Sequence, residues 1–196
     1  MKPLLPEFTG PARIQDYLDA LAYNCTDRTL SPHAVARERI AHCMDGAVFA
    51  ATALGALGHR PLLVDLRAVD DDDHVIAVFK ENGLWGAVAK SNTTSLRYRD
   101  PVFRSIRELA LSYFPVYFNT DGEMSLYEYS RPFSLRRYGS SYLDAADIAY
   151  IGDDLDASAH YPIVSRQRLK SLRIAPEYLI DACFLGANHE GLYKKH

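Results

Sequence analysis

The chain has 196 residues and a formal net charge of −3, and 48% of its residues are hydrophobic. This length predicts a single domain, and the composition is that of a folded protein rather than a disordered one. The slightly acidic charge argues against a broad basic surface for nucleic acid. No stretch approaches the roughly 18 apolar residues of a membrane span, and no signal sequence of basic-then-apolar type opens the chain. We therefore expect a cytoplasmic protein with neither nucleic-acid nor membrane partners.

The N-terminal part of the chain is predicted to be helical. A first helix follows Gly10-Pro11 and a second follows Ser31-Pro32, because proline is favoured in the first turn of a helix. Residues 43–58 are apolar on nearly every side and end at a glycine, which predicts a buried third helix.

The middle of the chain is predicted to form strands. Residues 61–68 alternate between apolar and polar positions, as a half-buried strand does. Residues 74–80 and 84–91 are apolar runs that flank Asn82-Gly83, which predicts a β-hairpin.

The remaining signals predict a further helix after Asp100-Pro101, a strand over 125–130 and a last helix over 175–186. The fold class is therefore α+β, with leading helices packed on an antiparallel sheet. We expect one domain with a core over about 30–118 and a C-terminal extension over about 119–196, to which the sequence assigns no role.

The three cysteines are Cys25, Cys43 and Cys183, and they lie too far apart for a zinc motif or a disulfide framework. They are therefore candidates for thiol chemistry. We expect all three to be free. Cys43 opens the buried helix, where unpaired N–H groups and the helix dipole favour a thiolate. His74 opens a predicted strand, and an imidazole beside a thiol would accept its proton.

Each of these residues also has an ordinary structural role. A cysteine at a helix start is more often a small buried hydrophobic residue than a nucleophile. A histidine that opens a strand is equally weak evidence for a catalytic role. A third group would have to hold the imidazole in place, and Ser91 and Asn92 are the candidates at the end of the next strand.

Two blocks of the sequence resemble the transglutaminase-like superfamily of papain-related cysteine enzymes. In that family a cysteine is followed by an acidic residue and an alanine at alternate positions, then by an apolar helix. A histidine at the start of an apolar strand, a tight turn and a tryptophan come next. The corresponding segments here read CMDGA at 43–47, LGALG at 54–58, HVIAVF at 74–79 and NGLW at 82–85.

The resemblance implies a papain-like or transglutaminase-like core and acyl chemistry on an amide or thioester. Cys43 would be the nucleophile, His74 the general base and acid, and the Cys43 N–H an oxyanion donor. The family has Asp-Pro four residues after its tryptophan, whereas this chain has Ala89 there. Asn92 is therefore expected to be the third catalytic residue, with Ser91 as the alternative.

This chemistry needs no cofactor and no metal. The run Asp70–Asp73 is expected to be a solvated acidic turn, because it lacks the spacing of a calcium loop. Trp85, Ser91 and Arg97 are candidates for a substrate pocket, although Trp85 has an alternative role in packing and Arg97 one in surface ion pairs.

The leading hypothesis is thus a hydrolase (peptidase or amidase) or an acyltransferase that acts on a protein, peptide or small amide substrate. One alternative is a catalytically silent module of the same fold that binds a protein or peptide. A buried Cys43, or an Asn92 far from His74, would favour the silent module. A third hypothesis is an acetyl-group transferase that uses the same residues on a thioester cofactor. The sequence does not predict the oligomeric state.

Overall fold

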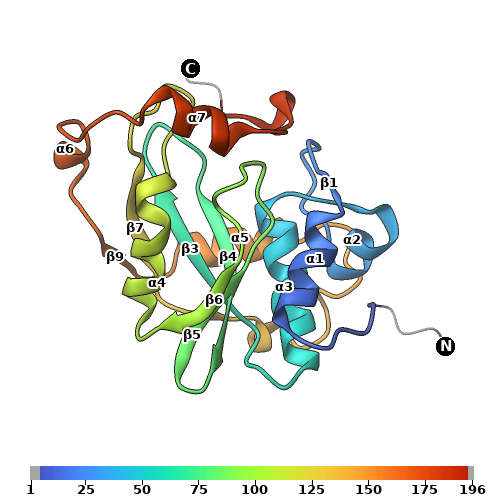
Figure 1. The fold of residues 1–196 in the computed structure, drawn as a ribbon. Helices are drawn as coiled ribbons and strands as arrows, with labels where there is room; N and C mark the ends of the chain where they lie inside the picture. The colour runs from blue at the N-terminus through green and yellow to red at the C-terminus, as the bar shows by residue number, and fades with distance from the viewer. Residues whose placement is uncertain (1–4, 194–196) are drawn as a thin grey trace.

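The structure is a computed structural model, and it describes residues 5–193 (Figure 1). Within these residues an antiparallel sheet lies between helices on its two faces, so the α+β prediction is confirmed (Figure 1). No helix in the described part of the chain is long and apolar enough to cross a bilayer.

Three helices near the N-terminus cover one face of the sheet. They are α1 (Pro11–Asp19), α2 (Pro32–Glu38) and α3 (Cys43–Ala56), and each begins where the sequence predicts. Between them, β1 (Ala22–Tyr23) and β2 (Ile40–Ala41) form a short parallel pair.

The large sheet has seven strands among the described residues. Its order is β6 (Arg99–Phe103), β5 (Leu84–Val88), β4 (His74–Glu81), β3 (Leu62–Ala68), β7 (Leu126–Ser130) and β9 (His160–Pro162), and β8 (Phe133–Ser134) also pairs with β3. Positive φ values of 49° at Asn82 and 83° at Gly83 close the β4–β5 hairpin as predicted.

The two faces of the sheet bury separate apolar clusters. Leu63, Val75 and Ala77 face α3, whereas Leu66, Ile76 and Val78 face α4 (Ile106–Tyr113). Successive strand residues point to opposite faces, and this alternation sets the direction of every side chain on β4.

A glycine lets the helix α3 approach the residue after β5 closely. A Cβ atom added to Gly46 would lie 2.4 Å from the Cβ atom of Lys90, which follows β5. The Lys90 ammonium reaches past α3 and donates to the carbonyls of Leu18 and Leu21, at 3.0 and 2.6 Å. This contact fixes the start of α3 against the end of the β4–β5 hairpin.

The prediction that a helix starts directly after Asp100-Pro101 is wrong. Residues 99–103 form β6, whose Arg99 and Phe103 pair with β5, and the helix starts only at Ile106 after an N-cap at Ser105. Pairing with β5 therefore overrides the local capping signal.

The C-terminal part completes the core rather than extending it. Strands β7 and β9 belong to the sheet, and α5 (Ala149–Asp156) buries Ile151 and Leu155 in the α3-face cluster. The core thus reaches beyond the expected limits of 30 and 118. The other short elements are η1 (Phe114–Val116), η2 (Leu135–Tyr138), α6 (Arg166–Leu169), α7 (Glu177–Phe184) and η3 (His189–Gly191).

Candidate active site

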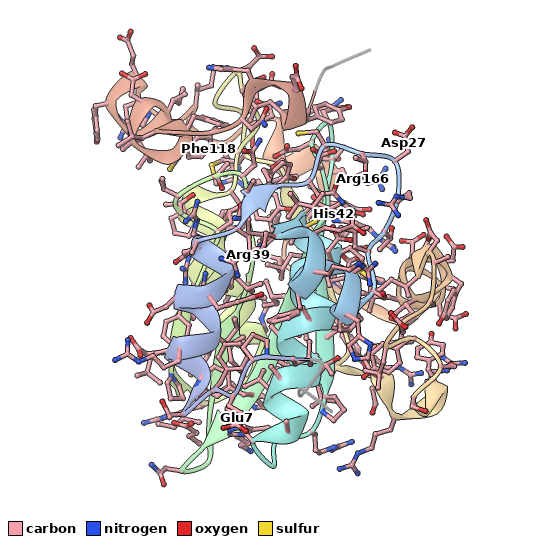
Figure 2. All side chains as sticks on the ribbon, turned by 90° about the vertical axis from the view of Figure 1, so that its right-hand side faces the viewer. Glu7, Asp27, Arg39, His42, Phe118 and Arg166 are labelled. Carbon is pink, nitrogen blue, oxygen red and sulfur yellow. The ribbon has the colours of Figure 1, made fainter. Side chains whose placement is uncertain are left out.

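The N-terminus of α3 is held by a capping box. The Nδ1 atom of His42 accepts from the N–H groups of Met44 and Asp45 at 3.1 and 3.4 Å, and Asp45 accepts from the His42 N–H at 3.0 Å. In Figure 2, His42 marks the upper end of α3, on the same side of the molecule as Phe118, and Glu7 lies near the opposite end. The next residue along the chain is Cys43.

Asp45 is fully buried and ties this end of α3 to the preceding loop. It accepts from the Asn24 side chain at 2.8 Å and from the Leu30 N–H at 2.7 Å. Burial raises the pKa of Asp45, while nearby His42 acts to lower it. Its role is to fix the start of the helix, in agreement with the structural role that its position suggests.

The thiol of Cys43 lies against the start of β4. Its Sγ atom is 3.8 Å from the Asp73 carbonyl oxygen, and the N–H groups of Val75 and Met44 donate toward it. These donors favour a thiolate, but burial is the larger effect and raises the pKa of Cys43 to about 12. In this conformation Cys43 is therefore a neutral thiol at physiological pH.

The imidazole of His74 is fixed by a main-chain carbonyl. Its Nε2 atom lies 2.7 Å from the Leu96 carbonyl oxygen, and its ring edge packs against Tyr113 of α4. A carbonyl only accepts, so Nε2 carries the proton and Nδ1 is the basic nitrogen. Nδ1 has no hydrogen-bond partner within residues 5–193. Burial lowers the pKa of His74 to about 4.

Cys43 and His74 line one pocket but do not form a hydrogen-bonded pair in the described structure. His74 shares the α4 face of the sheet with Leu66, Ile76 and Val78, while Cys43 belongs to α3 on the other face. With pKa values of about 12 and 4, transfer of the thiol proton to His74 is unfavourable by on the order of 10 kcal/mol. In this arrangement both groups are therefore neutral.

The space between the two groups is a cavity of about 70 Å³, which we name the Cys43 pocket. It is lined by Tyr23, by Cys43, and by residues from the segments 71–74, 91–96, 117–120, 184 and 191–193. That volume holds only a few water molecules and Cys43 is only partly exposed, so the pocket is too small to admit a substrate acyl group in this conformation.

Asn92 lines the Cys43 pocket but does not orient His74, which corrects the predicted third catalytic position. Its side-chain amide donates to the Asn188 carbonyl at 2.8 Å and accepts from the Asn188 N–H at 2.8 Å. The Leu96 carbonyl holds His74 instead.

The three predicted pocket residues have different locations. Ser91 lines the Cys43 pocket and accepts from the Thr93 N–H at 3.1 Å. Arg97 pairs with Asp19 at 2.8 Å and lines a neighbouring cavity of about 320 Å³. Trp85 is not in the pocket, because it pairs with Lys80 six residues beyond His74, about 20 Å along β4.

The acidic run next to His74 is more ordered than a solvated turn. Asp71 accepts from Ser125 at 2.7 Å and Asp73 accepts from the Ala68 N–H at 2.7 Å. Burial raises the pKa of each of these two carboxyls to about 6.

Among the described residues, the carboxylates of Asp65, Asp73 and Asp156 come within 4.8 Å of one another, close enough to hold a cation. Arg67 already occupies this place: it pairs with Asp156 and lies 4.0 Å from Asp65. His160 adds a second positive group, 3.0 Å from Asp65. The cluster is therefore an internal ion-pair network, and its charges are largely balanced.

Sequence reasoning missed Tyr23, the Leu96 carbonyl and the C-terminal residues of the pocket. Burial raises the pKa of Tyr23, and its proximity to Cys43 adds to the shift, so its hydroxyl stays a proton donor. Within the described residues that hydroxyl has no hydrogen-bond partner. No sequence signal links these residues to Cys43, and Tyr23 is separated from it by the whole of α2.

Comparison of the chain with models of known protein families found no match, and comparison with curated proteins found none either.

Proposed function

We propose that this protein is a cysteine hydrolase or acyltransferase of transglutaminase-like, papain-related fold, present here in a resting state. The observation that carries the proposal is the Cys43 pocket. A thiol at the first residue of a buried, capped helix and an imidazole with a fixed tautomer line the same cavity. Such a helix start is where a thiolate is stabilised most readily.

The proposed reaction is acyl transfer from an amide. Sγ of Cys43 attacks the carbonyl carbon, and the thiol proton passes through Nδ1 of His74 to the leaving amine as the C–N bond breaks. Water or a second amine then attacks the thioester and releases Cys43. The Cys43 N–H and the Tyr23 hydroxyl are donors available to the oxyanion. The substrate is a protein, a peptide or a small amide, and the step uses no cofactor.

Catalysis requires the pocket to open and His74 to turn toward Cys43. Admission of water or substrate would lower the pKa of Cys43 and raise that of His74, because burial is the main cause of both shifts. Catalytic hydrogen bonds often form only when substrate is bound, so their absence from the resting state is compatible with this role.

A second candidate is the catalytically silent module that binds a protein or peptide. Two observations favour it: Asn92 does not hold His74, and Cys43 and His74 are both neutral in the closed pocket. The two candidates differ in whether Cys43 becomes acylated in a step that depends on His74.

The test is formation of an acyl-enzyme. The purified chain is incubated with p-nitrophenyl acetate and with an acetyl thioester, and the intact protein and its peptides are analysed by mass spectrometry. The proposal expects one acetyl group on Cys43 that is absent from Cys43→Ser and strongly reduced in His74→Gln. Exposed Cys25 serves as the internal control for non-specific acylation.

Acylation of Cys43 that His74→Gln leaves unchanged, or labelling of Cys25 faster than Cys43 in every variant that folds, would support the silent module instead.

A further inference from the structure

The C-terminal segment, defined here as residues 186–193, lies on the Cys43 pocket. Gly191, Leu192 and Tyr193 line the pocket together with Cys43. Figure 1 shows α7, which precedes this segment, crossing the top of the molecule near the ends of the central strands. The pocket is thus closed by residues nearly 150 positions away from its nucleophile.

The loop after β5 binds this part of the chain through its main chain. Asn92 makes both of its hydrogen bonds to the backbone of Asn188, at 2.8 Å each. Two residues further on, Thr94 donates from its N–H to the Cys183 carbonyl at 2.8 Å and from Oγ1 to the Ala182 carbonyl at 2.7 Å. These bonds recognise a polypeptide backbone rather than particular side chains.

One position of the C-terminal segment is restricted to glycine. A Cβ atom on Gly191 would lie 2.5 Å from the ring of Tyr23 and 3.3 Å from the Asn92 amide nitrogen. Contacts below 3.0 Å with a packed ring force a displacement, so the backbone can pass Tyr23 only where it carries no side chain.

We propose that the surface formed by Tyr23 and Asn92 is a peptide-binding surface of the Cys43 pocket, and that the C-terminal segment occupies it as an intramolecular inhibitor, with Thr94 anchoring the end of α7 that leads into this segment. The inference rests on the proposed function, because it explains why the thiol is neutral in the closed state. A polypeptide with glycine at the Tyr23 position is the partner that would compete for the surface. A tethered segment has an effective concentration in the millimolar range, so few contacts suffice to keep the pocket closed.

The test uses the full-length chain with Gly191→Ala, which displaces the segment, and Glu190→Ala as the matched control, because Glu190 is the neighbouring exposed residue. Alkylation of Cys43 by iodoacetamide at pH 7.5 is followed by peptide mass spectrometry. Gly191→Ala should react at least about tenfold faster than wild type, and Glu190→Ala at the wild-type rate. Thr94→Val, which removes the hydrogen bonds of the Thr94 hydroxyl to the Ala182 and Cys183 carbonyls of α7, should give a smaller increase.

The second arm uses a fluorescent peptide with the sequence of residues 186–193. In a Cys43→Ser background, where no chemistry takes place, it should bind the Gly191→Ala chain and not the chain with an intact segment. A peptide with alanine at its second glycine should bind neither. Binding here together with absence of an acyl-enzyme would refute the proposed activity and leave the peptide surface standing.

The inference would be overturned if Cys43 in Gly191→Ala reacted at the wild-type rate although amide hydrogen exchange showed that Asn188 had lost its protection. It would also be overturned if the peptide bound both chains equally. Near-ultraviolet circular dichroism establishes whether each variant is folded. If Gly191→Ala is not folded, the alkylation rate of Thr94→Val is compared with that of wild type instead.

Discussion

His74 and His160 both place one ring nitrogen on a main-chain carbonyl, and both are shielded from water, with His74 4% exposed and the His160 side chain 5% exposed. Their pKa values nevertheless shift in opposite directions. Nδ1 of His160 lies 2.8 Å from the Ser158 carbonyl and Nε2 lies 3.0 Å from the Asp65 carboxylate, so both nitrogens donate. The hydrogen bond to Asp65 raises the pKa of His160. His74 has no carboxylate partner, and burial lowers its pKa to about 4.

The comparison shows that burial alone does not decide the charge of an imidazole. A carboxylate in contact outweighs the cost of removing water, whereas a neutral carbonyl does not. The ion-pair network around Asp65 is therefore a fixed charged element of the sheet. The Cys43 pocket holds neutral groups whose pKa values depend on how closed it is.

The largest effect should come from removing the partner of His160. Asp65→Asn leaves an imidazolium without a carboxylate and should lower the free energy of unfolding by about 3 kcal/mol at pH 6. The stabilisation linked to a raised pKa is complete below the ordinary value of 6.5 and is lost as the pH rises through the folded value. Urea unfolding at pH 6 and pH 9 should thus show the larger penalty at pH 6. Equal penalties at both pH values would contradict a charged His160.

His74 should give the opposite pH dependence. Its folded-state pKa lies below 6.5, so its contribution is complete above 6.5 and is lost as the pH falls toward about 4. Relative to His74→Gln, wild type should lose about 2 kcal/mol between pH 6.5 and pH 5. The raised pKa values of Asp71 and Asp73 act in the other direction but cancel in this difference. A difference that stays constant with pH would mean that folding leaves the pKa of His74 unchanged, and would contradict the lowered value.

The hydrogen bond between His74 and Leu96 can be separated from the charge of the ring. At pH 8, His74→Leu leaves the Leu96 carbonyl without its donor and should cost about 2 kcal/mol, while His74→Gln retains a donor and should cost less than about 1 kcal/mol. The two variants are compared by urea unfolding. Identical losses would show that packing against Tyr113, rather than this bond, determines the contribution of His74.

The smallest effect should come from Asn92. Asn92→Ala removes two hydrogen bonds to Asn188 at an exposed site and should lower stability by no more than about 1 kcal/mol. It should reduce hydrogen-exchange protection of the Asn188 amide without changing the NMR titration of His74. A shifted His74 titration would restore Asn92 to the orienting role that the sequence suggests.

Much of the fold follows from local patterns. The prolines at 11 and 32, the apolar helix that begins at Cys43 and the Asn82-Gly83 turn all define elements that the structure contains. Asp100-Pro101 misleads, because pairing with β5 outweighs a capping signal.

The candidate site is less predictable than the fold. The sequence identifies His74 as the start of a strand but not the face to which it points, which depends on how α3 and α4 cover the sheet. The partner of Asn92 is 96 residues away, and no periodicity links the two positions.

The central claim is that Cys43 and His74 act as nucleophile and base once the pocket is open. The most direct measurement is the pH profile of Cys43 alkylation from pH 5 to pH 10 in Gly191→Ala, with and without His74→Gln, and with Cys25 as the ordinary exposed thiol. The account predicts that Cys43 of the opened chain reacts at lower pH than Cys25, and that His74→Gln removes this advantage. A profile that is the same with and without His74 would contradict the account and leave a peptide-binding protein without catalysis.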